Sequence, residues 1–285
     1  MTYREALRAG RTHLLEAGVP DADLDAWYLL EFIRKRAGLP GDRTWFLMND
    51  REEMPDSEAK DYRELLDRRA ERIPLQHLTG EQEFMGLSFL VTPEVLVPRQ
   101  DTEILAEEAL SRLKPGMAVL DMCTGSGCII VSLARLCPGI RAAASDLSSG
   151  ALAVARENAK RLDTAVSFFQ GDLFEEVEGL YDVIVSNPPY IPTDDISGLM
   201  DEVRLHEPVM ALDGQADGLY FYRRLAKESR DFLKPGGCLL LEIGYDQGDA
   251  VKNLLEEAGF CNVCVKKDLA GLDRVVAAEN RGCLA

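Results

Sequence analysis

The residues best suited to chemistry form the run Asn187-Pro188-Pro189-Tyr190, which follows the apolar segment 181–186. A planar amide or aromatic amine nitrogen is a poor nucleophile because its lone pair is delocalised. The Asn187 side-chain oxygen and the Pro188 carbonyl can accept the two N–H bonds of such an NH2 group and turn its lone pair toward an electrophile. Two prolines, Pro188 and Pro189, fix the backbone, and Tyr190 offers a stacking face. We expect substitution at a planar nitrogen here; the alternative is a plain Pro-Pro turn.

A second candidate site is the loop between the apolar segment 118–122 and an apolar helix expected from residue 128 onward. The loop residues are Cys123, Thr124, Gly125, Ser126 and Gly127. Its two glycines let the backbone approach a ligand closely, and the start of the helix supplies free N–H groups. The loop alone is compatible with NAD, FAD or simple packing.

Acidic residues near this loop favour a cationic cofactor. Asp121 precedes the loop, which lacks the G-x-G-x-x-G spacing that cradles a pyrophosphate. S-adenosylmethionine carries a sulfonium and an ammonium but no phosphate, so we expect it as the methyl donor, with S-adenosylhomocysteine as the product. Asp146, at the end of the next strand, is placed to bind both ribose hydroxyls; the alternative is a cap for the helix after it, and the two roles do not exclude each other. Asp172, after the third strand, could face the adenine.

These segments have to be positioned by a sheet. From residue 114 onward, strand-like runs alternate with helical stretches, and we expect strands at 118–122, 141–145, 166–169, 183–186 and 239–243. The alternation indicates an α/β fold with a parallel, doubly wound Rossmann-like sheet, which binds ligands at the carboxyl ends of its strands. The Asn187 run follows such a strand.

The first part of the chain has a different pattern. Residues 1–75 read as helices, including 24–33 after a capped start at Pro20-Asp21 and a helix capped by Asp56-Ser57. Residues 80–98 alternate with period two around Gly86, which predicts a β-hairpin. We therefore expect a helical domain at 1–75, a hairpin linker at 76–100 and a catalytic domain at 101–285. The helical domain either only packs or recognises a partner.

Composition narrows the classes of function. The net charge of -17 disfavours stable nucleic-acid binding, although it does not exclude a local basic groove. No segment is apolar enough for a membrane span, so we expect a cytoplasmic protein. The seven cysteines, Cys283 among them, read as reduced thiols, and neither the Cys261/Cys264 pair nor the scattered histidines predicts a metal site. No heptad pattern is evident, so we expect a monomer.

With these motifs in place, the chain resembles the release factor glutamine methyltransferase family, also called the HemK family. Beyond the Asn187 run, the resembling stretches are 72–80, 86–89, 95–99, 202–208, 217–219 and 234–237. The resemblance covers nearly the whole chain. It implies a helical N-terminal domain, a hairpin linker and a seven-stranded class I methyltransferase domain. It also implies N5-methylation of the glutamine in the Gly-Gly-Gln motif of peptide chain release factors.

The resemblance also implies roles for single residues. The cofactor would be held by the loop from Cys123 to Gly127, by Asp146 and Asn187, and by Leu173 near the adenine, and the substrate glutamine by the segment from Asn187 to Tyr190. Two departures from the family pattern are visible. Gln100-Asp101 replaces the usual Pro-Glu, and Cys123 stands where glycine is common. We expect the cysteine to be tolerated on the condition that its φ is negative.

Three rival functions remain at this point. Adenine-N6 methyltransferases of DNA share the Asn-Pro-Pro-Tyr run, but the acidic surface and the lack of an evident target-recognition domain disfavour base flipping. A related group methylates a glutamine of a ribosomal protein. A cofactor-binding interaction protein without turnover belongs to a different class, and the intact Asn187 run disfavours it.

Overall fold

The computed structural model describes residues 1–281, which form two compact units. Unit 1 consists of Met1–Gly80 together with Met200–His206, and unit 2 consists of Glu81–Leu199 together with the residues from Glu207 on. Among residues 1–281, none of the helices combines the length and apolar character of a membrane span. Six cysteines in this range are free thiols, and Cys283 lies outside it.

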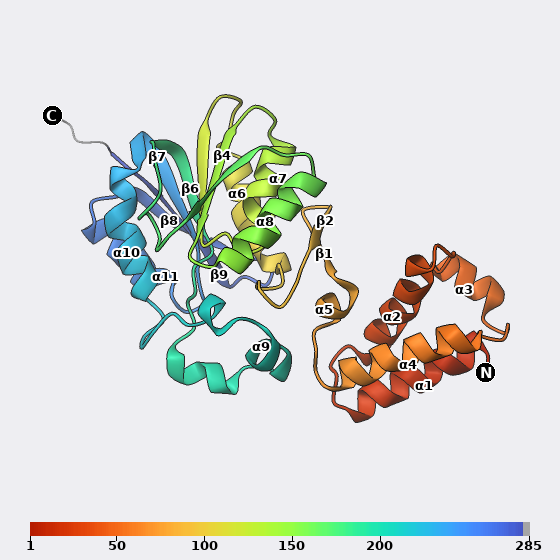
Figure 1. Cartoon of the computed structure of the whole chain (residues 1–285). Coiled ribbons are helices and arrows are strands. Elements are labelled where there is room, and N and C mark those ends of the chain that lie inside the picture. The colour runs from red at the N-terminus through yellow and green to blue at the C-terminus, as the bar shows by residue number, and fades with distance from the viewer. Residues whose placement is uncertain (282–285) are drawn as a thin grey trace. The chain divides into compact units, whose positions relative to one another are not determined.

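Unit 1 is helical (Figure 1). Its helices are α1 (Tyr3–Glu16), α2 (Ala22–Arg36), α3 (Arg43–Asn49), α4 (Asp56–Ala70), α5 (Leu75–Thr79) and α9 (Asp201–His206). Leu14, Leu30 and Leu66 lie in the core that α1, α2 and α4 share. Gly10 permits a close approach of α1 to α4, because a Cβ at this position would lie 2.5 Å from the Tyr62 hydroxyl oxygen.

The caps of these helices differ from the sequence expectation. Asp21 is the N-cap of α2 but makes no side-chain capping bond. The expected cap at Asp56-Ser57 is wrong, because Pro55 is the N-cap of α4 and Asp56 already belongs to the first turn. Proline is compatible with the extended backbone before a helix, and Asp56 acts there through its charge on the helix dipole.

Buried charges connect α9 to the other helices of unit 1. Arg69 Nε donates to Asp25 at 2.7 Å, and both side chains are buried. The same guanidinium reaches Glu202 of α9 at 3.1 Å, and Arg72 reaches the other Glu202 oxygen at 2.5 Å. The stretch 202–208 was singled out in the sequence only by its family resemblance. The structure shows why it begins with an acid: Glu202 pairs with two arginines of the helical unit.

Unit 2 is a seven-stranded sheet with helices on both faces (Figure 1). Its strands are β3 (Ala118–Met122), β4 (Arg141–Asp146), β5 (Val166–Gln170), β6 (Tyr181–Ser186), β7 (Leu233–Glu242), β8 (Cys261–Lys267) and β9 (Asp273–Glu279). The spatial order is β5-β4-β3-β6-β7-β9-β8. Neighbouring strands are parallel from β5 to β7, while β9 is antiparallel to both β7 and β8.

The helices of unit 2 divide between the two sheet faces. On one face lie α6 (Glu103–Leu110), α7 (Cys128–Leu136) and α8 (Ser149–Arg161), and on the other α10 (Tyr220–Glu228) and α11 (Gly248–Glu257). Short 3-10 turns occur at η1 (Gln100–Thr102), η2 (Thr193–Gly198), η3 (Val209–Ala211) and η4 (Ser229–Asp231). The expected doubly wound α/β fold is confirmed, with the antiparallel strand β9 and the outermost strand β8 added at one edge.

The expected hairpin is formed by β1 (Glu81–Phe84) and β2 (Leu87–Leu90). Its turn residues Met85 and Gly86 both have positive φ, 52° and 72°, as the tightest hairpin turns require. Phe84 and Phe89 are fully buried against the core of unit 2. The hairpin is therefore packed into unit 2 rather than free.

Candidate active site

The loop after β3 is held in shape by its own backbone. The Thr124 N–H donates to the Ser145 carbonyl at the end of β4 at 3.1 Å, and the Gly127 N–H donates to the Thr124 carbonyl at 2.8 Å. Gly125 and Gly127 both have positive φ, 54° and 77°. A Cβ on Gly127 would lie 3.0 Å from the Ala155 Cβ of α8. Glycine is thus required at Gly127 both for conformation and for space.

Cys123 takes an unexpected conformation. Its φ is +58°, in the left-handed region, so the condition of a negative φ is not met. A left-handed backbone brings Cβ close to a carbonyl oxygen and costs roughly 1–2 kcal/mol for a residue with a side chain. The turn at Cys123 brings Thr124 into its hydrogen bonds with Ser145 and Gly127, so the fold imposes the left-handed conformation on the cysteine. Cys123 therefore carries local strain at the rim of the site.

Replacing Cys123 should show this strain. Cys123→Gly removes the left-handed penalty, whereas Cys123→Val increases it, because a β-branched side chain tolerates positive φ worst. We expect the free energy of unfolding of the glycine variant to exceed that of the valine variant by about 1–2 kcal/mol. Urea unfolding of both variants would measure the difference. Equal stabilities would contradict the assignment of strain to this residue.

Asp146 ties the cofactor loop to the end of β4. One carboxylate oxygen accepts from the Gly125 N–H at 2.8 Å, and the other accepts from the Ser148 N–H at 2.9 Å. The alternative role of Asp146 as a helix cap is wrong, because Ser148 is the N-cap of α8 and its hydroxyl accepts from Ala151. Burial raises the pKa of Asp146, while the backbone bonds oppose the rise. The carboxylate lines the pocket described below, where it can accept hydroxyl groups.

Asp172 and Leu173 follow β5. Asp172 is exposed, and Arg224 binds both of its carboxylate oxygens at 2.7 and 2.8 Å. Leu173 is buried with φ of +55°, and its carbonyl accepts from the Ser145 hydroxyl at 2.9 Å. Both residues line the pocket. The Asp172 carboxylate therefore reaches the pocket rim already paired with a guanidinium, a partner that the sequence does not indicate.

Asp121 lies underneath the loop, not in the pocket wall. Its side chain is fully buried, and one oxygen accepts from the Thr124 hydroxyl at 2.6 Å. The other oxygen, Oδ1, has no hydrogen-bond partner within residues 1–281. Burial raises the pKa of Asp121 to about 7, although the hydrogen bond from Thr124 acts against the rise. A cation bound above the loop would stabilise the ionised form of this carboxyl.

This coupling predicts a pH dependence of cofactor binding. Below about pH 7 the Asp121 carboxyl is protonated in the free protein, and a bound cation lowers its pKa, so binding expels a proton. We expect the affinity for S-adenosylmethionine to rise from pH 6 to pH 8. Calorimetric titrations across this range would measure the rise, and Asp121→Asn should flatten it. A slope that persists in the variant would show that another group is responsible.

The run from Asn187 follows β6 in the middle of the sheet. Ser186 pairs with Met122 on one side and Leu241 on the other, and its hydroxyl donates to the Met122 carbonyl at 2.8 Å. Pro188 and Pro189 are buried, whereas Asn187 is half-buried. The strand end thus carries the Asn187 side chain to the edge of the sheet where the cofactor loop also lies.

Tyr190 is held from behind by its backbone. Its carbonyl accepts from Gln247 Nε2 at 3.0 Å, and a Cβ on Gly214 would lie only 2.8 Å from the Tyr190 backbone. Burial raises the pKa of the Tyr190 hydroxyl to about 12, so the ring stays neutral. Tyr190 can therefore offer a neutral aromatic face.

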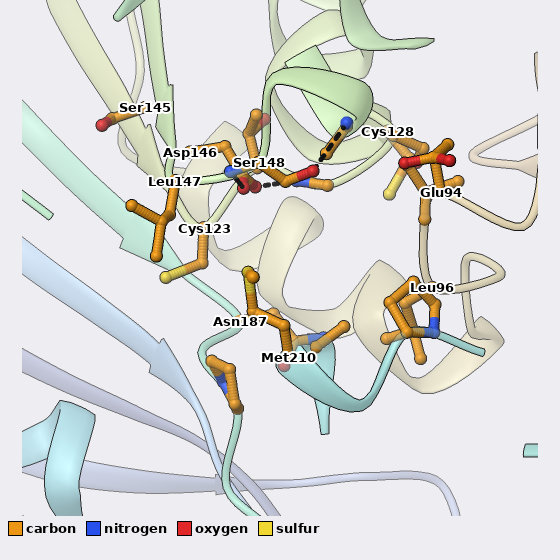
Figure 2. Close-up of a pocket in the computed structure, with 18 of the residues that line it drawn as sticks. Glu94, Leu96, Cys123, Cys128, Ser145, Asp146, Leu147, Ser148, Asn187 and Met210 are labelled. Carbon is orange, nitrogen blue, oxygen red and sulfur yellow. Dashed lines mark hydrogen bonds between the residues drawn. The ribbon is translucent and has the colours of Figure 1, made fainter. Parts of the chain in front are cut away.

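A pocket of about 300 Å³ joins these segments. In Figure 2, Cys123 and Met210 appear beside Asn187, Asp146 lies next to Ser148, and Leu96 is drawn on the opposite side of the pocket. The predicted site residues in its lining are Cys123, Thr124, Gly125, Ser126, Asp146, Asp172, Leu173, Asn187 and Pro189. Asp121, Gly127, Pro188 and Tyr190 are not part of this lining.

Sequence reasoning missed several residues of the pocket. The segment after the hairpin supplies Leu96 and Arg99, and η3 supplies Met210. Arg99 binds both oxygens of the buried Glu207 at 2.9 and 2.8 Å, which fixes the chain just before η3. Arg99 and Glu207 lie in the stretches 95–99 and 202–208, which resemble the family. The sequence therefore pointed to both stretches, but it did not indicate that the two residues pair.

Asn158 of α8 is a second missed residue. Its amide donates to the carbonyls of Leu90 and Ser126 at 3.0 and 2.9 Å, and its oxygen accepts from the Leu90 N–H at 2.7 Å. The side chain is fully buried. One amide therefore joins the hairpin to the cofactor loop, a role that its place in a polar helix sequence does not reveal.

Comparison with known proteins agrees with this architecture. Residues 5–80 match the PrmC N-terminal domain, and residues 100–202 match the methyltransferase small domain. The release factor glutamine methyltransferase of Geobacter sulfurreducens is 44% identical over 98% of this chain and 96% of its own length. That of Moorella thermoacetica is 45% identical over 99% of both. The chain belongs to the release factor glutamine methyltransferase family.

Solved structures support the fold of this family member. A methyltransferase from Pyrococcus furiosus covers 69% of this chain and 90% of its own, with a TM-score of 0.53 and 21% identity. The 16S rRNA N2 G1207 methyltransferase from Thermus thermophilus, solved with AdoMet and guanosine, covers 70% of this chain and 50% of its own, with a TM-score of 0.52 and 20% identity. At these identities the likeness concerns the fold alone.

Proposed function

We propose that this chain methylates the side-chain amide nitrogen of the glutamine in the Gly-Gly-Gln motif of peptide chain release factors, with S-adenosylmethionine as methyl donor. The observation that carries the proposal is the shared pocket of Asn187 and the cofactor loop. Full-length relatives that carry this activity in their names support the substrate.

The residues around the loop suit S-adenosylmethionine. Asp146 would accept the ribose hydroxyls, and Leu173 would lie against the adenine. The unpartnered Asp121 oxygen would supply negative potential beneath the cationic end. When bound, the cofactor supplies a methyl group activated by its sulfonium. Three of the four charged lining residues are the carboxylates Glu94, Asp146 and Asp172, and the fourth, Arg99, is already bound to Glu207, so the lining suits a cation better than a phosphate.

The Asn187 segment would then orient the substrate amide. The Asn187 Oδ1 and the Pro188 carbonyl would accept its two N–H bonds, and the Tyr190 ring would stack on its plane. This turns the nitrogen lone pair toward the methyl group, so that the new N–C bond forms as the S–C bond breaks. The nitrogen becomes acidic in the process and loses one proton to water. The rate of methyl transfer would come from the positioning of the substrate amide, and no general base would be needed.

Unit 1 would serve substrate recognition, and residues 76–100 would act as the linker to the methyltransferase domain. The negative net charge supports a protein substrate over a phosphate backbone. We place the reaction in the cytoplasm, where release factors act, and we propose that the enzyme works as a monomer.

A methyl-transfer assay tests this proposal. Labelled S-adenosylmethionine would be offered with a purified release factor, with the same factor carrying alanine in place of the motif glutamine, with ribosomal proteins, and with adenine-containing DNA. We expect label in the intact release factor alone. Label in the alanine form would refute the glutamine target, and label in ribosomal protein or DNA alone would refute the release factor as substrate.

A further inference from the structure

Glu242 is a buried carboxylate to which the reaction described above gives no role. It is the last residue of β7 and is 2% exposed. Its Oε2 atom has no hydrogen-bond partner among residues 1–281. A buried carboxylate with an unsatisfied oxygen costs free energy that a neutral side chain would avoid. Stability of the fold therefore does not explain why Glu242 occupies this position.

The sheet register places Glu242 beside Asn187. Ser186 of β6 pairs with Leu241 of β7, and the two strands are parallel. The next residues along the two chains, Asn187 and Glu242, therefore leave the sheet at the same level. Hydrogen bonds from the Asn187 and Thr102 side chains act on the Glu242 carboxylate. The pairing of β6 with β7 thus brings the buried Glu242 next to the side-chain amide of Asn187.

Thr102 completes this arrangement. It ends η1, is buried, and its hydroxyl oxygen lies 3.3 Å from Asn187 Nδ2, which donates to it. The Thr102 hydroxyl in turn donates a hydrogen bond, and the Glu242 carboxylate accepts it. The Nδ2 group of Asn187 therefore faces Thr102 and Glu242 on the protein side.

A carboxylate fixes the direction of this amide. The two ends of an asparagine side chain have nearly the same shape, so shape alone does not orient it. Burial raises the pKa of Glu242 to about 7, and the ionised form, which predominates above that pH, only accepts hydrogen bonds. In that form the Nδ2 group of Asn187 must face Glu242 and Thr102. The Oδ1 atom then points away from them. A glutamine at position 242 could donate as well as accept, and would permit the reversed amide.

We propose that Glu242, together with Thr102, is a positioning residue that holds the Asn187 amide with Oδ1 toward the substrate nitrogen. The proposal rests on the proposed function insofar as Asn187 receives the substrate NH2 group. The cation whose charge acts on the acid is Arg274, which is itself paired with Asp101 and Asp268 at 3.1 Å. The acid therefore keeps its acceptor role toward Asn187, without a guanidinium hydrogen bond of its own.

A double-mutant cycle tests whether Glu242 acts through Asn187. We expect Glu242→Gln to lower kcat for release factor methylation about tenfold, with the Kd for S-adenosylmethionine unchanged. In an Asn187→Ala background the same change should have no further effect, since the group it orients is gone. Equal losses in both backgrounds, or no loss in the wild-type background, would overturn the proposal.

Two further variants serve as comparisons. Thr102→Val should lower kcat, and Thr102→Ser should restore it, because the hydroxyl is what matters. Asp182→Asn is the matched control, since Asp182 is an acid of the same strand pair that binds Lys234 at 2.7 Å at the far end of β6. It should leave kcat unchanged, and a loss as large as that of Glu242→Gln would overturn the proposal.

A measurement without turnover separates this proposal from the proposed function. The side-chain NH2 signals of Asn187, assigned by their loss in Asn187→Ala, can be followed by nitrogen-15 NMR. We expect them to shift in Glu242→Gln and Thr102→Val but not in Asp182→Asn. Unshifted signals would overturn the positioning role even if the enzyme methylates release factors. A wild-type protein that methylates none would overturn the proposed function, while the signals still decide the role of Glu242.

Discussion

Asn187→Ala should lower kcat for methyl transfer to a release factor on the order of 10² or more, while S-adenosylmethionine still binds. The variant removes the acceptor that directs the substrate nitrogen, but leaves the cofactor loop and Asp146 in place. Because Asn187 is half-buried at a strand end, its truncation removes little packing. Single-turnover rates with labelled cofactor, together with calorimetric cofactor binding, would measure both effects.

The matched control for this prediction is Asn253→Ala. Asn253 is an exposed asparagine on α11, so its truncation should change neither rate nor binding. A methylation rate that survives Asn187→Ala would remove Asn187 from the mechanism. A rate lost together with cofactor binding would instead make Asn187 chiefly a cofactor ligand.

Asp146→Ala should raise the Kd for S-adenosylmethionine by about 10² to 10⁴, because two hydroxyls would each lose a hydrogen bond to a charged acceptor worth about 1.5–3 kcal/mol. The variant also removes the acceptor of the Gly125 N–H, which anchors the loop. Asp146→Asn keeps one acceptor oxygen, so its effect should be intermediate. Calorimetric titration with S-adenosylhomocysteine, which has the same ribose, would measure the series.

The control here is Asp249→Ala, an exposed acid in the first turn of α11. It removes the same charge without touching the pocket, so binding should be unchanged. Wild-type affinity in Asp146→Ala would show that the ribose is held elsewhere. An equal loss in both variants would reduce the effect of Asp146 to net charge.

Ion pairs between residues far apart in the chain could not be predicted from the sequence. The Arg224 guanidinium that binds Asp172 lies 52 positions away in the chain, and Glu202 joins Arg69 across 133 positions. Nothing in the spacing of these residues indicates such pairs, because charged surface residues can pair in many ways of similar energy. Only the packing of the elements selects one of them.

By itself, the sequence determined the strands and the segments that end them. The apolar runs at 118–122 and 141–145 match β3 and β4 at their first residues, because buried parallel strands need continuous apolar sequence. Since strand ends of one parallel sheet share an edge, the Asn187 run was also placed near the cofactor loop. Covalent geometry and the apolar pattern of a strand are local, so they can be read from neighbouring residues.

Only the tertiary structure decided how the site is supported. The left-handed Cys123 follows from the need of the loop to close against Ser145 and Gly127. The contact of Glu242 with the Asn187 run follows from the pairing of β6 with β7, whose ends are separated by more than 50 residues of sequence. Such contacts depend on strand order and register. The sequence therefore determined the residues that would face a substrate, and the fold decided which residues stand behind them.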